Sequence, residues 1–131
     1  MPLDLDILDL PTLDLNADLG ESWGPVRRGD DEAMLDVVTT ANIACGGHAG
    51  DPPTMRAAAA GAARRGIAIT AHVSYPDPEG FGRRFQDIAP AELIDQIVVQ
   101  AGGLMAMAAA EGTRVCGVKP HGALYNALAH H

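Results

Sequence analysis

The sequence is poor in aromatic residues, with two Phe, two Tyr and one Trp among 131 residues. A hydrophobic core must therefore be built mainly from Ala, Val, Leu, Ile and Met, a composition that is common where helices cover a sheet. Apolar residues still make up 47% of the chain, and charged residues 20%. This balance is typical of a globular, soluble protein and argues against intrinsic disorder.

Long apolar runs and a basic N-terminal region are also absent. No apolar run approaches the roughly 18 residues that a membrane-spanning helix needs. The first residues alternate Asp with apolar residues and follow no basic region, which argues against a signal peptide. The two cysteines, Cys45 and Cys116, lack CxxC spacing, so buried free thiols are favoured over a disulfide. We therefore expect a cytoplasmic protein that does not contact a membrane.

Basic residues are too few for a nucleic-acid-binding surface. Nine Lys and Arg stand against 17 Asp and Glu, which gives a net charge of -8 and a pI near 4.8. Since nucleic-acid binding needs a basic surface, nucleic acid is excluded as a partner. A Walker-type phosphate loop is absent as well, because no Gly-rich segment ends in Gly-Lys-Ser/Thr. We therefore expect this chain not to bind ATP through a P-loop.

What the sequence does contain is an alternation of strand-like and helix-like segments. Four short apolar runs each end in polar or Gly-rich residues, at 12–19, 41–47, 67–73 and 113–119. Helix-like segments lie between them and open with acidic residues or proline, at 30–32, 51–54 and 90–92. This alternation predicts βαβ units with parallel strands, because the strand spacing fits crossovers of about 30 residues.

We expect an α/β fold, a (β/α) barrel of which only about the first four βα units are present. A complete barrel needs about 250 residues. For residues 1–11, which end in Pro11, an unstructured N-terminal extension is favoured over an edge strand. Residues 12–131 would then form a partial barrel domain, truncated at its C-terminus. A half barrel exposes a strand edge, so we expect either a fragment or a chain that needs a partner to complete its sheet.

Polar residues gather directly after each strand-like segment. In parallel α/β folds the carboxyl ends of the strands face one crevice, and ligands bind there. We therefore expect these side chains to meet in one site. In chain order, the candidates are Asn16, Asp18, Glu21, Asn42, His48, Asp51, His72, Tyr75, Arg83, Arg84, Lys119, His121, Tyr125 and Asn126.

Asp18, His48 and His121 are the strongest candidates for chemistry. One carboxylate and two imidazoles from different strand ends could hold a divalent metal, and they could equally form a metal-free proton relay. Lys119 could pair with a carboxylate or a phosphate, and the Arg83–Arg84 pair could clamp an anion. Each of these residues also has a plainer interpretation, as a solvated surface group or as a loop residue bonded to the backbone.

Four strings in the sequence are distinctive: LDLNADLGESWG (13–24), ANIACGGHAGDP (41–52), AHVSYPDPEGFGRR (71–84) and VKPHGALYN (118–126). In this order and spacing they resemble the LamB/YcsF family, which provides the A subunit of prokaryotic 5-oxoprolinase. The resemblance covers nearly the whole chain, whereas family members are longer, so it is to their N-terminal half. It implies a distorted (β/α) barrel related to the glycoside hydrolase/deacetylase superfamily.

The resemblance also implies an activity and partners. Family members convert 5-oxo-L-proline (pyroglutamate), ATP and water to L-glutamate, ADP and phosphate, together with subunits B and C. We expect those subunits to handle ATP with its Mg²⁺, while the present chain hydrolyses the activated lactam. Asp18 or His48 would be the base and His121 the acid. The implied substrate-binding residues are Asn16, Glu21, Asn42, His72, Tyr75, Arg83, Arg84, Lys119 and Asn126.

Two alternatives stay open at this point. One is a metal-dependent hydrolase of the deacetylase kind, with Asp18, His48 and His121 as the ligands of a divalent ion. The other is a non-catalytic chain, either a truncated fragment or an assembly component that binds partners through its open sheet edge.

Overall fold

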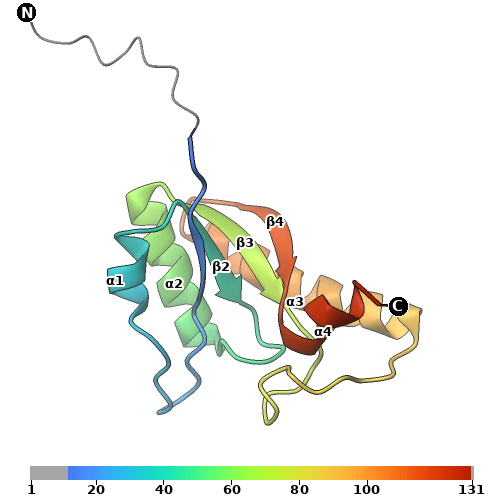
Figure 1. The fold of residues 1–131 in the computed structure, drawn as a ribbon. Helices are drawn as coiled ribbons and strands as arrows, with labels where there is room; N and C mark the ends of the chain where they lie inside the picture. Colours follow the sequence, from blue (N-terminus) through green and yellow to red (C-terminus); the bar gives the residue numbers. More distant parts are fainter. Residues whose placement is uncertain (1–11, 131) are drawn as a thin grey trace, which may run out of the picture.

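Residues 12–130 fold into four β-strands and four α-helices in alternation (Figure 1). The structure is a computed structural model that describes these residues, and the predicted N-terminal extension (1–11) lies outside them. The strands are β1 (Asn16–Leu19), β2 (Thr40–Ala44), β3 (Ala68–Val73) and β4 (Val115–Pro120). The helices are α1 (Asp31–Leu35), α2 (Pro52–Arg65), α3 (Pro90–Ala110) and α4 (Gly122–Ala127).

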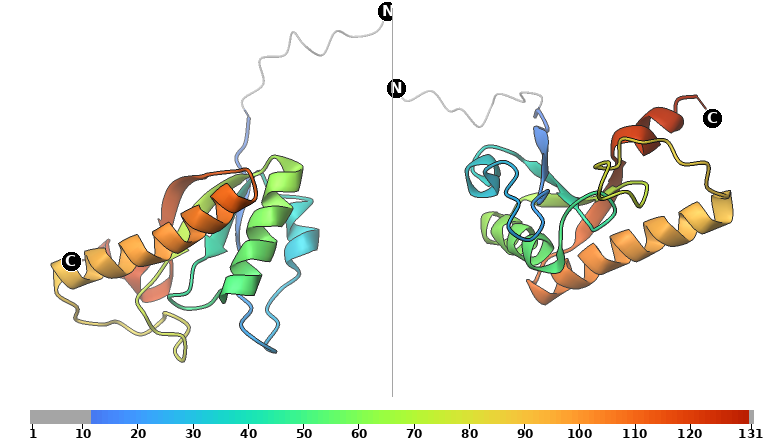
Figure 2. Two further views of the ribbon diagram at one scale, coloured as in Figure 1. Left: turned by 180° about the vertical axis from the view of Figure 1, so that it is seen from behind. Right: turned by 90° about the horizontal axis from the view of Figure 1, so that it is seen from below.

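The strands form one parallel sheet in the order β1-β2-β3-β4. Because neighbours in the sheet are also neighbours in the chain, every crossover advances in the same direction, as in a barrel. A doubly wound sheet would instead reverse its strand order. Helices α1, α2 and α3 lie side by side on one face of the sheet (Figure 2). The α/β fold with four βα units of a partial barrel is thus confirmed.

The hydrophobic core lies between the sheet and these helices. Its largest fully buried side chains are aliphatic and include Ile43, Ile69 and Leu104. Alanines of α2, such as Ala59 and Ala62, are fully buried and let the helix approach the sheet closely. The core is therefore built from aliphatic residues, as the shortage of aromatic residues predicts.

The ends of helix α2 show how the sequence sets element boundaries. Asp51 caps its N-terminus, because its carboxylate accepts a hydrogen bond from the Thr54 N–H at 3.0 Å, and Pro52 occupies the first turn. Gly66 ends the helix in the left-handed conformation (φ 65°), which costs glycine little. The helix therefore begins where the sequence predicts it, within 51–54.

Among the described residues, helix α3 is long and apolar enough to cross a membrane, with a mean hydropathy of 1.5. A count of uninterrupted apolar runs does not find it, because polar residues such as Gln100 interrupt the segment. In the structure α3 packs beside α2 and against β3, and it buries Gln100, Leu104 and Ala108. We therefore interpret α3 as an outer-layer helix of the sheet.

Candidate functional site

The face of the sheet away from the helices carries a network of polar side chains. Strand pairing places Asp18 beside Asn42 and Asn42 beside Thr70. The buried amide of Asn42 donates to Asn16 Oδ1 at 2.8 Å and to Asp18 Oδ1 at 3.1 Å. The Thr70 hydroxyl donates to Asn42 Oδ1. Because every polar atom of this amide is bonded, Asn42 holds Asp18 in a fixed orientation.

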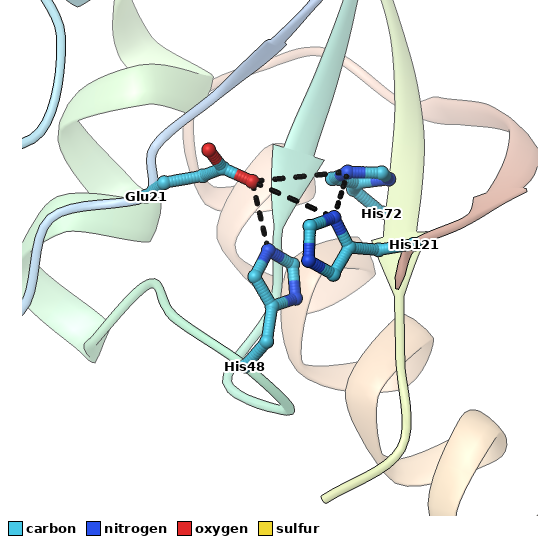
Figure 3. A group of neighbouring side chains, drawn as sticks. All are labelled: Glu21, His48, His72 and His121. Carbon is cyan, nitrogen blue, oxygen red and sulfur yellow. Dashed lines mark hydrogen bonds and ion pairs between the residues drawn. The ribbon is translucent and has the colours of Figure 1, made fainter. Parts of the chain in front are cut away.

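A cluster of three histidines and one glutamate lies at the carboxyl ends of the four strands (Figure 3). Glu21 follows β1, His48 lies in the loop after β2, His72 lies near the end of β3, and His121 directly follows β4. We call these four residues the histidine–glutamate cluster. Each offers one ligand atom, and these atoms all lie within 4.8 Å of one another. Segments far apart in the sequence thus converge, because parallel strands end at one edge of the sheet.

The four side chains of the cluster are in direct contact. His48 Nε2 lies 2.8 Å from Glu21 Oε1, and His121 Nδ1 lies 3.1 Å from His72 Nε2. The rings of His48 and His121 stack, with centroids 3.6 Å apart and planes inclined by 9°. The three imidazoles are buried and Glu21 is partly exposed. Buried polar groups in such close contact are held in place by their surroundings and do not sample solvent.

Two glycines allow the backbone to shape the site. Gly82 has φ 64°, and a Cβ at this position would lie 2.9 Å from His48 Cβ and 3.1 Å from His121 Cδ2. Gly50 has φ 83°, and a Cβ there would lie 2.6 Å from the carbonyl oxygen of Ala44. A side chain at Gly82 would therefore displace the stacked imidazoles, and one at Gly50 would open the loop that carries His48.

Asp18 and Lys119 form an ion pair beside the cluster. The Lys119 ammonium donates to Asp18 Oδ1, while Asp18 Oδ2 lies 3.3 Å from His72 Nε2. Burial opposes ionisation of Asp18, but the hydrogen bonds from His72 and Lys119 outweigh this cost and lower the pKa of its carboxyl well below the usual range. Asp18 is therefore a charged anchor and a weak base at neutral pH.

The electrostatics of the cluster disfavour the charged forms of His48 and His121. Burial lowers the pKa of His48, and the hydrogen bond with Glu21 offsets only part of that effect. Burial and the neighbouring His48 ring lower the pKa of His121 to about 4. Burial disfavours the charged form of Glu21, but the hydrogen bond with His48 and the electrostatic interactions with the three imidazoles together outweigh it, so the pKa of Glu21 is lowered. At neutral pH the cluster therefore combines the Glu21 carboxylate with the uncharged rings of His48 and His121.

Cavities open on two sides of the cluster. One, of about 370 Å³, is lined by His72, His121, Asp18, Lys119 and Asn126 among others. The second, of about 300 Å³, borders Glu21 and His48. A larger cavity of about 620 Å³ lies against α1 and α2 and includes no member of the cluster, so its size alone does not make it the site. The two smaller cavities give a small molecule access to the cluster.

The structure brings many of the predicted site residues together. Asp18, His48 and His121, the predicted catalytic residues, lie in or beside the cluster. Of the predicted substrate-binding residues, those that join them there or line the adjoining cavity or polar network are Glu21, His72, Lys119, Asn126, Asn16 and Asn42.

Other predicted residues lie elsewhere. Tyr75 is buried in the hydrophobic core, with its ring against Phe85 at 5.9 Å. Arg84 forms an ion pair with the buried Asp77, which ties the loop after β3 together. The Arg83 guanidinium lies over the Phe81 ring, 5.2 Å from its centroid.

Phe81 is a site residue that the sequence does not reveal. Its ring contacts His48 and His121 edge-on, with centroids 5.0 and 5.2 Å away, and the Arg28 guanidinium lies 4.4 Å above its centroid. Phe81 has φ 54°, an unusual backbone conformation for a residue other than glycine. The string GFGRR marks the position as a turn, but no rule of spacing assigns its ring to the site.

The cluster suits a divalent metal as well as proton transfer. Three imidazole nitrogens and one carboxylate oxygen are typical ligands of zinc-like ions. This set contains His48 and His121, which the sequence predicts as ligands, together with Glu21 and His72. Asp18, the third predicted ligand, lies beside the set and contacts His72.

Known proteins resemble this chain along most of its length. Residues 13–131 match the model of the LamB/YcsF family. Proteins named as the A subunit of 5-oxoprolinase are 57% identical over 119 residues in Mycolicibacterium gilvum (strain PYR-GCK) and 56% identical over 117 residues in Paracidovorax citrulli (strain AAC00-1). These alignments cover 91% and 89% of this chain and 47% of each relative.

A solved structure is similar as well. The lactam utilization protein from Thermus thermophilus is 43% identical, with a TM-score of 0.86 over 88% of this chain and 47% of that protein. The chain therefore spans about half the length of the relatives that it matches. On this sequence and structural similarity, the chain belongs to the LamB/YcsF family.

Proposed function

We propose that this chain contributes the lactam-opening site of a 5-oxoprolinase, which hydrolyses 5-oxo-L-proline to L-glutamate. The observation that carries the proposal is the convergence of three buried imidazoles and two carboxylates at one end of a parallel sheet. The names of the relatives supply the substrate class, a lactam. Since those relatives are about twice as long, we propose the whole reaction for the assembled protein and not for these residues alone.

Opening a lactam demands a nucleophilic water and a proton for the departing nitrogen. The water oxygen bonds to the carbonyl carbon and gives up a proton, the ring C–N bond breaks, and the nitrogen takes up a proton. ATP, with Mg²⁺ and handled by partner subunits B and C, would activate the carbonyl by transferring its terminal phosphoryl group to the carbonyl oxygen. Breaking the C–N bond then leaves an acyl phosphate, and a second water releases phosphate from it to give the side-chain carboxylate of glutamate. The task of this chain is then to bind the lactam and to move protons.

The cluster supplies groups for both proton transfers. His48, paired with Glu21 at 2.8 Å, is the better base, because the lowered pKa of Asp18 makes its carboxylate a poor one. His121 stacks on His48, and its pKa of about 4 keeps it uncharged at neutral pH. His121 can therefore protonate the departing lactam nitrogen only after it has itself received a proton, so it acts as a proton relay.

The 370 Å³ cavity beside the cluster suits a small anionic substrate. Lys119 lines it and keeps 36% of its side chain exposed, so its ammonium can bind the carboxylate of 5-oxoproline. Asn126 lines the same cavity and can hydrogen-bond the ring amide. The lactam carbonyl would then face His72 and His121. A cytoplasmic location fits this role and stays a prediction.

Glutamate release tests the proposal. The chain is mixed with partner subunits B and C, 5-oxoproline, Mg²⁺ and ATP, and the glutamate formed is measured. If the chain is competent, His48→Ala abolishes glutamate formation, while the matched control His130→Ala, an exposed histidine outside the cluster, leaves it unchanged. Normal turnover by a folded His48→Ala chain would refute the assignment.

A further inference from the structure

We propose that Glu21, His48, His72 and His121 together bind one divalent transition-metal ion of the zinc type. This metal site rests on the proposed function for its catalytic meaning and changes the roles within it: with their lone pairs on an ion, the His48 and His121 rings would hold the ion in place of moving protons, and the ion would supply the activated water. Metal binding itself is a separate property, which can be measured without substrate, ATP or partner subunits. Each of the three rings forms a hydrogen bond to an acceptor outside the cluster, and this bond determines which ring nitrogen carries the hydrogen. The other nitrogen of each ring is then free to bind an ion.

The outer nitrogen of His48 carries its hydrogen. His48 Nδ1 lies 3.2 Å from Ser74 Oγ, and the Ser74 hydroxyl donates its hydrogen bond to the carbonyl oxygen of Tyr75 at 2.9 Å. Ser74 Oγ can therefore only accept from the ring, so Nδ1 must be the donor. In a neutral imidazole the other nitrogen, Nε2, is then bare, and it faces Glu21.

The other two rings follow the same rule. His72 Nδ1 lies 2.9 Å from the carbonyl oxygen of Lys119, and His121 Nε2 lies 2.9 Å from that of Phe81. A carbonyl oxygen accepts hydrogen bonds and never donates them, so both of these nitrogens carry hydrogen. The bare nitrogens are then His72 Nε2 and His121 Nδ1. In neutral rings they face each other at 3.1 Å with no hydrogen between them, and His72 Nε2 then also lies bare 3.3 Å from Asp18 Oδ2.

Three ring nitrogens and one carboxylate oxygen therefore gather in one small space, and the stacked rings of His48 and His121 would tilt apart to direct both lone pairs at one ion. Lone pairs at this distance repel one another, and a cation among them turns the repulsion into attraction. Around zinc, with bonds near 2.0–2.1 Å, tetrahedral ligand atoms lie about 3.3 Å apart. Glu21 Oε1 lies 2.8, 3.8 and 3.9 Å from the ligand nitrogens of His48, His72 and His121. These separations bracket the tetrahedral value.

The surroundings of the cluster match those of metal sites. A histidine that binds a metal almost always donates its other N–H to a carbonyl, carboxylate or similar acceptor, which orients the ring. Here Ser74 Oγ and the carbonyls of Lys119 and Phe81 provide that acceptor for all three rings. Three nitrogen ligands favour a zinc-like ion over Mg²⁺ or Ca²⁺, which prefer oxygen.

Extra protons are the competing explanation for the same geometry. One proton between His48 and Glu21, and another on His72 Nε2, where it can bond to His121 or to Asp18, would also separate the facing lone pairs. That arrangement makes the cluster a proton relay with no affinity for metal. A metal titration distinguishes the two cases, because only one of them yields a saturable site.

The test is a titration of the chelator-stripped 131-residue chain with Zn²⁺ by calorimetry, and with Co²⁺ by visible absorption. We expect one ion per chain and a Co²⁺ spectrum typical of nitrogen and oxygen ligands in a tetrahedral field. Glu21→Gln and His72→Ala should each weaken binding at least about 100-fold. Ser74→Ala, which removes only the outer acceptor for His48, should weaken it about 10- to 100-fold.

Two controls make the result decisive. The double variant His130→Ala/His131→Ala removes the adjacent histidines at the end of the sequence, which could bind metal by themselves, and it should keep the full affinity. Circular dichroism of each metal-free variant checks that it folds. If His72→Ala does not fold, Glu21→Gln, which preserves the shape of the side chain, carries the test.

Two results would overturn the proposal. One is the absence of a stoichiometric ion, and the other is an ion that is lost with His130 and His131 but kept in Glu21→Gln. Either would leave glutamate release untouched as a test of the proposed function. Conversely, a bound ion without glutamate release would refute the activity and keep the metal site.

Discussion

The histidines of the cluster illustrate how single residues acquire chemistry from their neighbours. Each ring is buried, and each donates an outward hydrogen bond that fixes which nitrogen faces inward. A buried polar group without such a partner would cost about 1–3 kcal/mol. The outer acceptors therefore do two things: they stabilise the buried rings, and they leave bare nitrogens directed at one another. The same logic of burial and partners predicts the behaviour of residues outside the cluster.

The two cysteines should differ in reactivity. Burial raises the pKa of the Cys45 thiol to about 12, whereas Cys116 lies exposed on β4. The thiolate is the reactive form, so Cys45 should resist alkylation in the folded chain. We expect a maleimide to modify one thiol quickly and the second only after unfolding, as measured by mass spectrometry. Rapid labelling of Cys45 in the folded chain would contradict the packing described here.

The ion pair of Asp77 and Arg84 should make stability depend on pH. The hydrogen bonds from Arg84 hold the pKa of Asp77 below its usual range. A depressed carboxyl pKa contributes stability above the unfolded value of about 3.9, and that stability is lost as the pH falls towards the folded value. The melting temperature of Asp77→Asn should therefore fall below that of the wild type at about pH 6, and the gap should narrow below about pH 4. A gap that is equal at both pH values would contradict this interpretation.

At the scale of elements, loops and helix ends position the site. The loop after β3 reaches across to α4, where the N–H of Ala123 donates to the carbonyl oxygen of Gly82 at 2.9 Å. The approach is so close that a Cβ on Gly122 would lie 2.4 Å from that oxygen. Two separate connections are thus joined above the stacked rings of His48 and His121. The elements hold the site by backbone contacts, which the side-chain pattern alone does not reveal.

Helix caps offer a paired test at this scale. Asp51 caps α2, and its second carboxylate oxygen also accepts from the Gly24 N–H at 2.7 Å. Helix α3 begins at Ala89, which has no side chain to cap it. We expect Asp51→Ala to lower the free energy of unfolding by about 1 kcal/mol and Ala89→Ser to raise it by about the same amount. Urea denaturation measures both, and a loss of stability in Ala89→Ser would contradict the predicted cap.

The sequence predicts the alternation of elements and part of the site. Repeated apolar runs followed by polar residues place His48 and His121 at strand ends, and alternation within 12–19 puts Asn16 and Asp18 on one face. Both features depend on local spacing, which the sequence contains. The close approach of His72 to Glu21 depends on the register between β2 and β3, which places Ala44 beside His72. Strand register is a property of the folded chain and cannot be derived from local spacing.

Tyr75 shows the limit of a local interpretation. It follows β3 in a stretch of polar and turn-forming residues, which predicts a site residue. In the structure the Tyr75 side chain is instead buried in the core, with its ring against that of Phe85. Packing decides whether a side chain that follows a strand lies in the core or in the site, and a single sequence carries no signal for that choice.

The whole molecule is an open sheet covered by helices on one side. Helix α3 keeps large apolar side chains on its surface, among them Ile94, Val98, Val99 and Met105, each more than half exposed. Strands β1 and β4 form the two edges of the sheet among the described residues. Exposed apolar faces and open edges favour association between molecules.

Surface charge on α3 should therefore change the solution behaviour of the chain. We expect the chain with Val98→Lys/Val99→Lys to remain monomeric up to a higher protein concentration than the wild type, as measured by analytical ultracentrifugation. The matched control Ala106→Lys/Ala109→Lys adds the same charge at exposed positions of the helix without removing large apolar side chains. Equal behaviour of the two variants would show that charge alone, and not the apolar face, controls association.

The lactam should bind beside the histidine–glutamate cluster, and this is the claim on which the proposed function depends. The most direct measurement is the ¹⁵N NMR spectrum of the histidine rings, recorded on the chain assembled with its partner subunits while 5-oxoproline is added. We predict that the ring signals of His72 and His121 shift on saturation, while those of His130, outside the cluster, stay in place. Saturation with 5-oxoproline that leaves the signals of all cluster histidines unmoved would contradict the claim.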